Sequence, residues 1–271
     1  MMPFTILRTL QLPVLFTLII FIVCSCTKIT QAPANPNIKK LLYKEVYGNG
    51  DTLYFGYDSK FRLVQVFGHD MNGIDKDFKF TYDDDNHLVG ALNGYYRNGA
   101  ATFTFKYYLP DSAKVTFQAV GAYPNNWMLS FNKSGQLVKK DVGYDAQQRG
   151  INYISYTTYS YDAAGNLVTV DHSHDEGTPQ IETYAYDDKK TPFYNVVGLS
   201  PLFSLILNDN EHGYPDTFIH NRVHLSYSTV PQLPGDTYTY QYDSDGYPVS
   251  AAFKPNGVES LTIQYFYYNS H

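Results

Sequence analysis

The segment Tyr161-Asp162-Ala163-Ala164-Gly165-Asn166-Leu167 (YDAAGNL) is the unit from which most of the chain is built, because copies of it recur along the sequence. Asp162 suits the first position of a type I turn, since its carboxylate can accept hydrogen bonds from backbone N–H groups two residues on. Gly165 can adopt the positive φ angle that closes a hairpin with a bulge. Alternating residues from Tyr153 to Tyr161 precede the turn, and Leu167 to Val170 follow it. The stretch therefore predicts strand, turn, strand.

Related units recur with a period of about 25 residues, which is typical of a repeat. They begin at Tyr57, Tyr82, Phe131, Tyr186 and Tyr242, with a degraded unit at Tyr107. Phe61 and Lys190 fit the positive-φ position poorly, whereas Asn86 is tolerated there, so we expect another geometry at those two turns. The predicted structural turn residues are Asp58, Asp83, Asn132, Gly135, Asp162, Gly165, Asp187, Asp243 and Gly246.

The segments between the turns alternate between apolar and polar residues from Leu41 onward. Phe78, Phe80 and Tyr82, for example, alternate with Lys79 and Thr81. One face of each strand is therefore apolar, and each repeat supplies about two antiparallel strands. We predict an all-β, up-and-down meander of about 14–18 strands. So wide a sheet should curl into a barrel or a strongly coiled half-barrel.

The repeat unit resembles the YD repeat of Rhs and teneurin-type proteins. The Tyr-rich spacing, the tail Tyr238–Pro248 (YTYQYDSDGYP) and the N-terminal signal described next are more similar to a family of Bacteroidetes lipoproteins of unknown function. That family is described as porin-like in fold. The resemblance covers roughly residues 41 to 268, and it implies a fold and an envelope location. It carries over no active site, because its motif is turn chemistry.

The N-terminus predicts a lipoprotein signal over residues 1–25. Arg8 precedes an apolar run from Leu10 to Val23 that is too short for a membrane span of about 20 residues. Val23-Cys24-Ser25-Cys26 resembles a lipobox, in which cleavage between Ser25 and Cys26 leaves a lipid-modified Cys26. An ordinary signal peptide or a short anchor that happens to contain two cysteines is the alternative.

A polar stretch rich in Pro follows and predicts a flexible tether over residues 26–40, before a single β domain over residues 41–271. In the resembling family, acidic residues after the lipidated cysteine mark export to the cell surface. Thr27 and Lys28 stand there instead, so we expect an outer-membrane lipoprotein that faces the periplasm.

Composition restricts the partners and the chemistry. Both cysteines lie at or before Cys26, so the folded domain has no disulfide available. Loss of Arg8 takes the formal charge from −6 to −7, which argues against a nucleic-acid partner and against an electrostatic hold on anionic lipid. The expected partners are the membrane, through the lipid, and a glycan or protein of the envelope; no cofactor is implied.

The segment Pro192–Leu207 breaks the alternation with sixteen uncharged residues. Ser200 and Pro201 predict a short helix that ends at Leu207, buried against the apolar face or one open end of the sheet. A continuous buried strand pair is the alternative, because short apolar runs are ambiguous by periodicity. A ligand gate is a third.

Two groups of histidines raise the question of a metal site. Asp171–Glu176 places His172 and His174 on one strand face, but a third ligand would have to come from a neighbouring strand. A solvated hairpin tip is the commoner outcome for such a run. His220 and His224 also share a predicted strand face, and the same alternative applies.

Other candidate sites are weaker. The acidic turns at Asp83 and Asp243 faintly resemble calcium loops, but Lys254 stands where an EF-hand needs glutamate. Trp127, with Tyr123, could stack on a sugar or belong to the core. No nucleophile motif, zinc motif or phosphate loop occurs. A pair of carboxylates across strands stays open.

Three hypotheses follow. The first is a non-enzymatic, lipid-anchored envelope β-protein of binding or scaffold type. The second is a β-barrel embedded in the outer membrane, and the third is an envelope hydrolase that acts on glycans.

Overall fold

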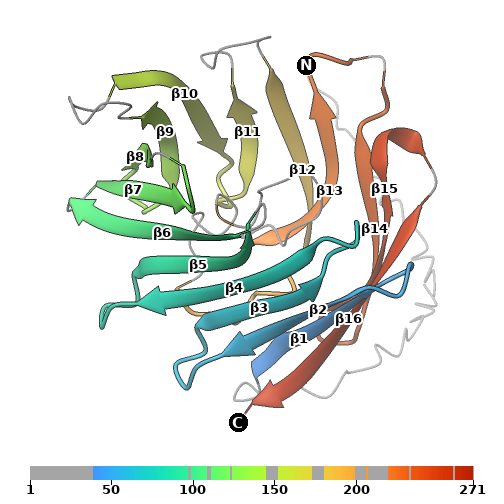
Figure 1. Cartoon of the computed structure of the whole chain (residues 1–271). Coiled ribbons are helices and arrows are strands. Elements are labelled where there is room, and N and C mark those ends of the chain that lie inside the picture. The colour runs from blue at the N-terminus through green and yellow to red at the C-terminus, as the bar shows by residue number, and fades with distance from the viewer. Residues whose placement is uncertain are drawn as a thin grey trace, which may run out of the picture. The chain divides into compact units, whose positions relative to one another are not determined.

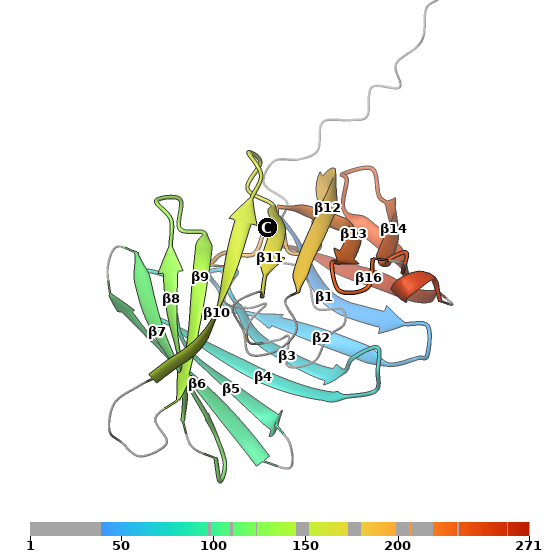
Figure 2. The ribbon, with the colours of Figure 1, turned by 90° about the horizontal axis from the view of Figure 1, so that it is seen from above.

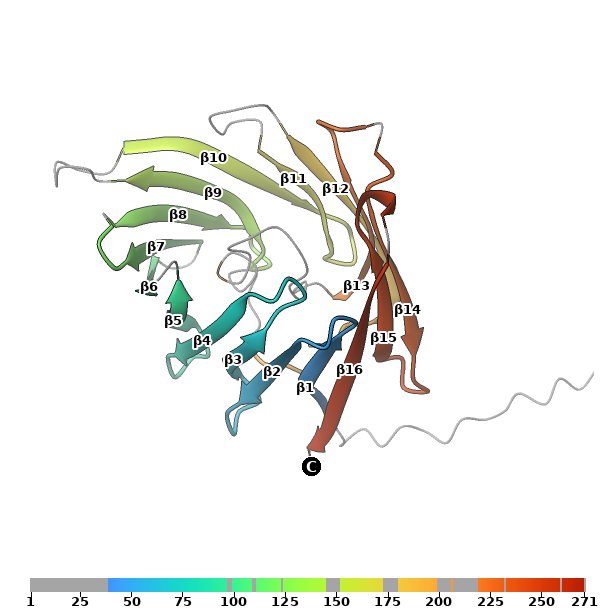
Figure 3. The ribbon, with the colours of Figure 1, turned by 45° about the vertical axis from the view of Figure 1, so that its right-hand side comes forward.

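The barrel is the main feature of the computed structural model. The structure describes residues 39–96, 99–108, 111–122, 124–144, 152–172, 180–198, 206, 219–231, 233–258 and 260–270. Within them, sixteen strands follow one another in chain order, each antiparallel to the next (Figure 1). The last strand, β16, pairs with the first, β1, and closes the sheet (Figure 3). The predicted all-β meander is confirmed, with a strand number inside the expected range and full closure.

The strands are β1 (Lys39–Tyr47), β2 (Thr52–Tyr57), β3 (Leu63–His69), β4 (Asp75–Tyr82), β5 (Leu88–Tyr96), β6 (Gly99–Tyr108), β7 (Ser112–Ala119), β8 (Asn125–Phe131), β9 (Leu137–Tyr144), β10 (Asn152–Tyr161), β11 (Leu167–Asp171), β12 (Ile181–Lys190), β13 (His220–Tyr227), β14 (Asp236–Tyr242), β15 (Pro248–Lys254) and β16 (Leu261–Ser270). A 3-10 turn, η1 (Pro255–Gly257), connects β15 to β16. No helix among the described residues is long and apolar enough to cross a membrane.

The first side chain of the repeated turn accepts hydrogen bonds from two backbone N–H groups of the same turn. The Oδ1 atom of Asn132 accepts hydrogen bonds from the backbone N–H groups of Ser134 and Gln136 at 2.9 and 3.0 Å. Asp243 makes the same pair of bonds with Asp245 and Tyr247. The fourth residue of the turn has a positive φ, which is 75° at Gly135, 93° at Gly165 and 81° at Gly246.

The expectation of another geometry at Phe61 is wrong. Phe61 has a φ of 62°, and Asn86 at the equivalent position has 67°. Tertiary contacts offset the strain at Phe61. Its ring lies under the ammonium of Lys39, 4.5 Å from the ring centroid, and its carbonyl oxygen accepts a hydrogen bond from the N–H of Val197 at 3.0 Å.

The unit at Tyr186 differs from the others. β12 continues through Lys190, so Asp187 does not open a hairpin. Asp187 instead accepts hydrogen bonds from the backbone N–H of Asn221 and from the hydroxyl of Tyr242. The side chain at this position opens a turn in other units, whereas Asp187 joins β12 to β13 and β14.

In four of the units the first residue is a tyrosine whose hydroxyl donates a hydrogen bond, which phenylalanine could not do. The acceptor is the carbonyl oxygen of the last residue of the preceding unit, and Tyr267 in β16, which begins no unit, makes the same bond to the unit at Tyr242. Five such bonds, 2.6–2.9 Å long, join Tyr82 to Leu63, Tyr107 to Leu88, Tyr161 to Leu137, Tyr186 to Leu167 and Tyr267 to Pro248. Each bond ties a strand to the hairpin before it.

Alternation along the strands places apolar side chains inside the barrel and polar side chains outside. In β4, Phe78 and Phe80 are buried whereas Lys79 and Thr81 are exposed. The buried side chains form one cluster with Phe193 from the connection between β12 and β13. The cluster therefore lines the inside of the barrel along β1–β9 and β14–β16.

The segment Thr191–Gly198 covers the inside of the barrel at the end where the repeated turns lie. Phe193 is buried and packs edge-on against Phe55, with ring centroids 5.3 Å apart. Val197 bridges to Arg62 beside the turn at Phe61. The helix expected from Ser200 to Leu207 lies outside the described residues except for Ile206, which is buried in the same core.

The N-terminal predictions lie outside the described residues. They are the signal over residues 1–25, cleavage between Ser25 and Cys26, acylation of Cys26 and most of the tether. One boundary differs, since Lys39 and Lys40 belong to β1 rather than to the tether. The ammonium of Lys40 has acidic partners in the turn between β14 and β15.

Candidate functional site

The inner face of the barrel has an apolar half, from β2 to β8, and a polar half, from β11 to β14. Figure 2 shows the path of these strands around the barrel. The strands from β2 to β8 present apolar side chains that are at most 6% exposed, such as Leu53, Phe55, Val66, Phe78, Phe103 and Val115. From β11 to β14 the inner face carries polar side chains that are only partly buried. Strand register places Glu182 beside the inward Val170, and Tyr184 beside Leu225. The polar half is the candidate site.

We call His172, Glu182, Tyr184, Arg222 and Tyr238 the inner-wall cluster. Glu182 accepts a hydrogen bond from the hydroxyl of Tyr184, and its Oε1 lies 3.4 Å from Nε2 of His172. Arg222 donates a hydrogen bond to the hydroxyl of Tyr238 at 2.9 Å. Its guanidinium lies 5.0 Å from the ring centroid of Tyr238 and 5.7 Å from that of Tyr184. One carboxylate and one guanidinium thus lie among aromatic rings.

Electrostatics keep the carboxyl of Glu182 ionised. Burial alone would raise its pKa, but the hydrogen bonds from His172 and Tyr184 and the charge of Arg222 lower it below the ordinary value. The side chains of His172 and Glu182 are 30% and 19% exposed, so solvent reaches both. The cluster therefore offers fixed donors and acceptors beside aromatic faces, which suits the binding of a polar ligand.

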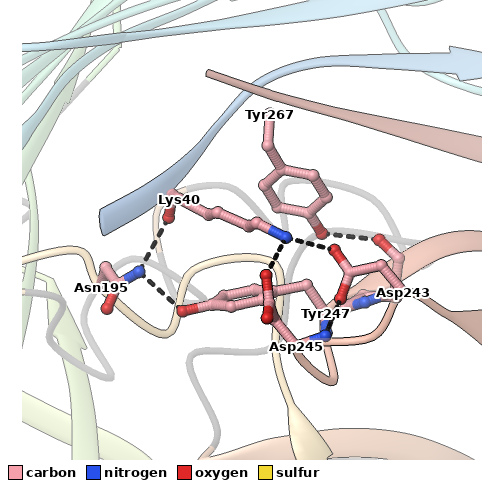
Figure 4. Close-up of polar contacts among 7 residues, drawn as sticks. Lys40, Asn195, Asp243, Asp245, Tyr247 and Tyr267 are labelled. Carbon is pink, nitrogen blue, oxygen red and sulfur yellow. Dashed lines mark hydrogen bonds and ion pairs between the residues drawn. The ribbon is translucent and has the colours of Figure 1, made fainter. Parts of the chain in front are cut away.

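A second polar group, which we call the latch, consists of Lys40, Asn195, Asp243, Asp245 and Tyr247 and lies at the end of the barrel where the repeated turns lie. Figure 4 draws these side chains. The ammonium of Lys40 in β1 lies 2.7 Å from Asp243 and 2.6 Å from Asp245, in the turn between β14 and β15. Asn195 donates hydrogen bonds to the carbonyl oxygen of Lys40 and to the hydroxyl of Tyr247 at 2.9 and 2.7 Å. The latch thus holds the first strand, this turn and the segment Thr191–Gly198 together.

The contacts within the latch favour the charged forms of both Lys40 and Asp243. Burial alone would lower the pKa of Lys40, but the hydrogen bonds to Asp243 and Asp245 raise it. Burial alone would likewise raise the pKa of Asp243, but the bond from Lys40 lowers it. The ammonium of Lys40 therefore occupies the carboxylates of the acidic turn at Asp243, the turn that faintly resembles a calcium loop.

Glu45 is a buried carboxyl on the inner side of the seam between β1 and β16. It is 4% exposed, and the hydroxyl of Tyr47 donates a hydrogen bond to it at 2.8 Å. Burial raises its pKa to about 7, and the bond from Tyr47 only partly opposes that rise. Below pH 7 the folded barrel therefore favours the protonated form of Glu45.

We expect the free energy of unfolding to fall as the pH rises from 4.5 to 7, and we expect replacement of Glu45 by glutamine to remove that fall. Because the folded protein holds a proton that the unfolded chain releases near the ordinary pKa of 4.5, the penalty is absent below that pH. Above pH 4.5 the loss of unfolding free energy grows to about 3 kcal/mol at most near pH 7, and it stays constant at higher pH. Urea unfolding of Glu45→Gln and wild type across this range measures the difference. The exposed Asp84→Asn serves as control, and an equal pH dependence in all three proteins would contradict the assignment.

The predicted histidine and aromatic sites have different outcomes. His174 lies outside the described residues, and His172 belongs to the inner-wall cluster. The prediction that His220 and His224 share a face fails, because a register shift between Arg222 and His224 interrupts the alternation. Trp127 packs against the core, 6.0 Å from Phe103. Within the described residues, no group of three His, Cys, Asp or Glu side chains is placed to hold a metal ion.

Comparison with known proteins supports the barrel fold but indicates no particular activity. No protein-family model matches the sequence, and no curated protein matches it. Among solved structures, the chain is similar to a porin-like protein from Bacteroides uniformis ATCC 8492, with a TM-score of 0.51 and 16% identity over 84% of this chain and 96% of that chain. The two proteins share a fold. The porin-like part of the sequence resemblance is thereby supported, whereas the YD-repeat family has no such support.

Sequence reasoning missed Glu182 and Arg222. Glu182 has the same parity as Tyr184 and Tyr186 in β12, which places it on the inward face of that strand. A charge on an otherwise aromatic inward face was the available signal. Arg222 gave no such signal, because the shift in β13 changes which of its residues point inward.

Proposed function

We propose that the chain is a lipid-anchored envelope protein whose barrel stands in water and binds a polar ligand at the inner-wall cluster, without catalysing a reaction. The observation that carries this proposal is the distribution of side chains across the wall. Exposed outward residues are polar in strands around the barrel, as with Lys79, Lys106, Thr239 and Gln264. A glycan or protein of the envelope is the expected partner, reached from the periplasmic side.

This distribution is the reverse of the one a membrane-embedded pore requires. An embedded barrel turns an apolar band to lipid and a polar face to its lumen. A lysine on the lipid face at mid-membrane depth costs about 2–4 kcal/mol. Lys79 and Lys106 both lie within strands and point outward, whereas the inner faces of β4 and β6 carry buried phenylalanines. Water suits the outer surface of these strands better than lipid.

The second candidate is a barrel embedded in the outer membrane, and the architecture taken alone favours it. Closure with sixteen strands and the likeness to a porin-like protein both support it. The outward aromatic residues Tyr54 and Phe67 support it locally, because aromatic residues collect at membrane interfaces. The two candidates differ in their requirement for detergent.

The test is to express residues 27–271 without the signal and to examine the product in buffer without detergent. We expect a monodisperse species with a β-type circular dichroism spectrum and a cooperative melt. Recovery only as aggregate, which detergent converts into a heat-modifiable barrel, would establish the embedded form instead. Lys106→Leu sharpens the comparison, because it should lower solubility if the outer surface is wet and raise stability in detergent if that surface faces lipid.

A further inference from the structure

One region of the outer surface departs from the polar pattern. Four large aromatic side chains are exposed on β16, β1, β2 and β3, which are neighbours in the sheet. Tyr43 is 36% exposed, Tyr54 39%, Phe67 41% and Tyr268 39%. Together with Lys44 and Phe266 we call them the outer aromatic patch. On β6, by comparison, the outward residues Thr102, Thr104 and Lys106 are polar, and Tyr108 is the one exposed aromatic side chain of that strand.

The members of the outer aromatic patch form a contiguous surface. Strand register aligns Phe266, Lys44, Tyr54 and Phe67 in one row across four strands. The rings of Tyr54 and Phe67 stack with centroids 5.1 Å apart, and those of Tyr43 and Tyr268 lie 6.1 Å apart. The ammonium of Lys44 lies 4.2 Å from the ring centroid of Phe266 and 5.9 Å from that of Tyr43.

The chemistry of the outer aromatic patch suits the headgroup region of a phospholipid membrane. Tyrosine combines an apolar ring with a polar hydroxyl and collects where lipid meets water. Lys44 can bury its methylene stem beside the rings and leave its charge among the headgroups. The row ends at Asp77, which faces Phe67 from β4. Attachment here depends on aromatic area rather than on net charge, as the acidic chain requires.

The chain itself brings the outer aromatic patch to a membrane. Lys39 opens β1 only four residues before Tyr43 and follows Cys26 by thirteen residues. Thirteen residues reach at most about 45 Å when extended. A lipid on Cys26 would therefore hold this wall near the membrane at high effective concentration. We infer that the outer aromatic patch docks the barrel onto the phospholipid surface that holds Cys26, an inference that rests on the proposed lipid anchor.

Single-tryptophan probes test the docking in the intact lipoprotein. The sequence has one tryptophan, Trp127, so Trp127→Phe provides a silent background. Tyr54→Trp then reports the outer aromatic patch. Tyr108→Trp is a matched control on β6, where Tyr108 is 41% exposed with the Lys106 ammonium 5.2 Å from its ring centroid. In vesicles that contain brominated phosphatidylethanolamine and phosphatidylglycerol, we expect quenching of Tyr54→Trp and none of Tyr108→Trp.

A second measurement uses the barrel without its lipid. Sedimentation with the same vesicles should show about tenfold weaker partition for Tyr54→Ser/Phe67→Ser than for wild type, and unchanged partition for Tyr108→Ser. Quenching at neither position overturns the docking and leaves a soluble barrel, whereas quenching at both indicates an embedded barrel and overturns the proposed function as well. A dimer that the double variant disperses, without quenching, assigns the surface to a second copy. A mass spectrum without acyl chains on Cys26 also overturns the inference.

Discussion

Replacing Phe193 with alanine is expected to lower the free energy of unfolding by about 3–5 kcal/mol. Phe193 is 2% exposed, and its ring packs edge-on against Phe55 inside the barrel. Truncation removes the apolar area and leaves a cavity, because the surrounding strands are hydrogen-bonded to both neighbours and can collapse only partly. Urea unfolding followed by circular dichroism measures the loss.

The neighbouring residue supplies the control. Tyr194 is 54% exposed, so Tyr194→Ala should change stability by less than about 1 kcal/mol. If the two variants unfold alike, the segment Thr191–Gly198 is not part of the folded core. A large difference would mean that this segment folds with the barrel and does not act as a separate gate.

The local structure follows from the sequence because its causes are local. The carboxylate of Asp162 and the positive φ of Gly165 act within one turn, so the motif alone predicts the hairpin. Phe61 shows where this reasoning stops. Its left-handed φ is kept by contacts with Lys39 and Val197, which lie in other parts of the chain.

The candidate site depends on long-range geometry. The latch joins Lys40 to Asp243, 203 residues apart, and only closure of the barrel brings them together. Glu182 and Arg222 both contact Tyr184, and the register shift in β13 that turns Arg222 inward cannot be read from the sequence pattern of that strand. Inward and outward faces could be assigned from alternation, but bulges decide which polar residues meet.

Gly68→Ala is expected to cost about 3–5 kcal/mol, because it combines backbone strain with a clash inside the sheet. Gly68 has a φ of +121°, a region that L-residues rarely adopt, and an added Cβ would overlap the carbonyl oxygen of Thr52. The clash is hard to relieve, since Gly68 pairs with Leu53 in β2 and with Lys76 in β4. Thermal and urea unfolding measure the cost.

Gly121→Ala separates the two contributions. Gly121 also has a positive φ, of +76°, but no atom lies within 4 Å of an added Cβ. It should therefore lose only the strain of about 1–2 kcal/mol. An equal loss in both variants would mean that β2 and β3 do not approach so closely at Thr52. Gly68 immediately follows Phe67, so pushing the two strands apart there should also separate Phe67 from Tyr54 and weaken the attachment of the barrel to vesicles.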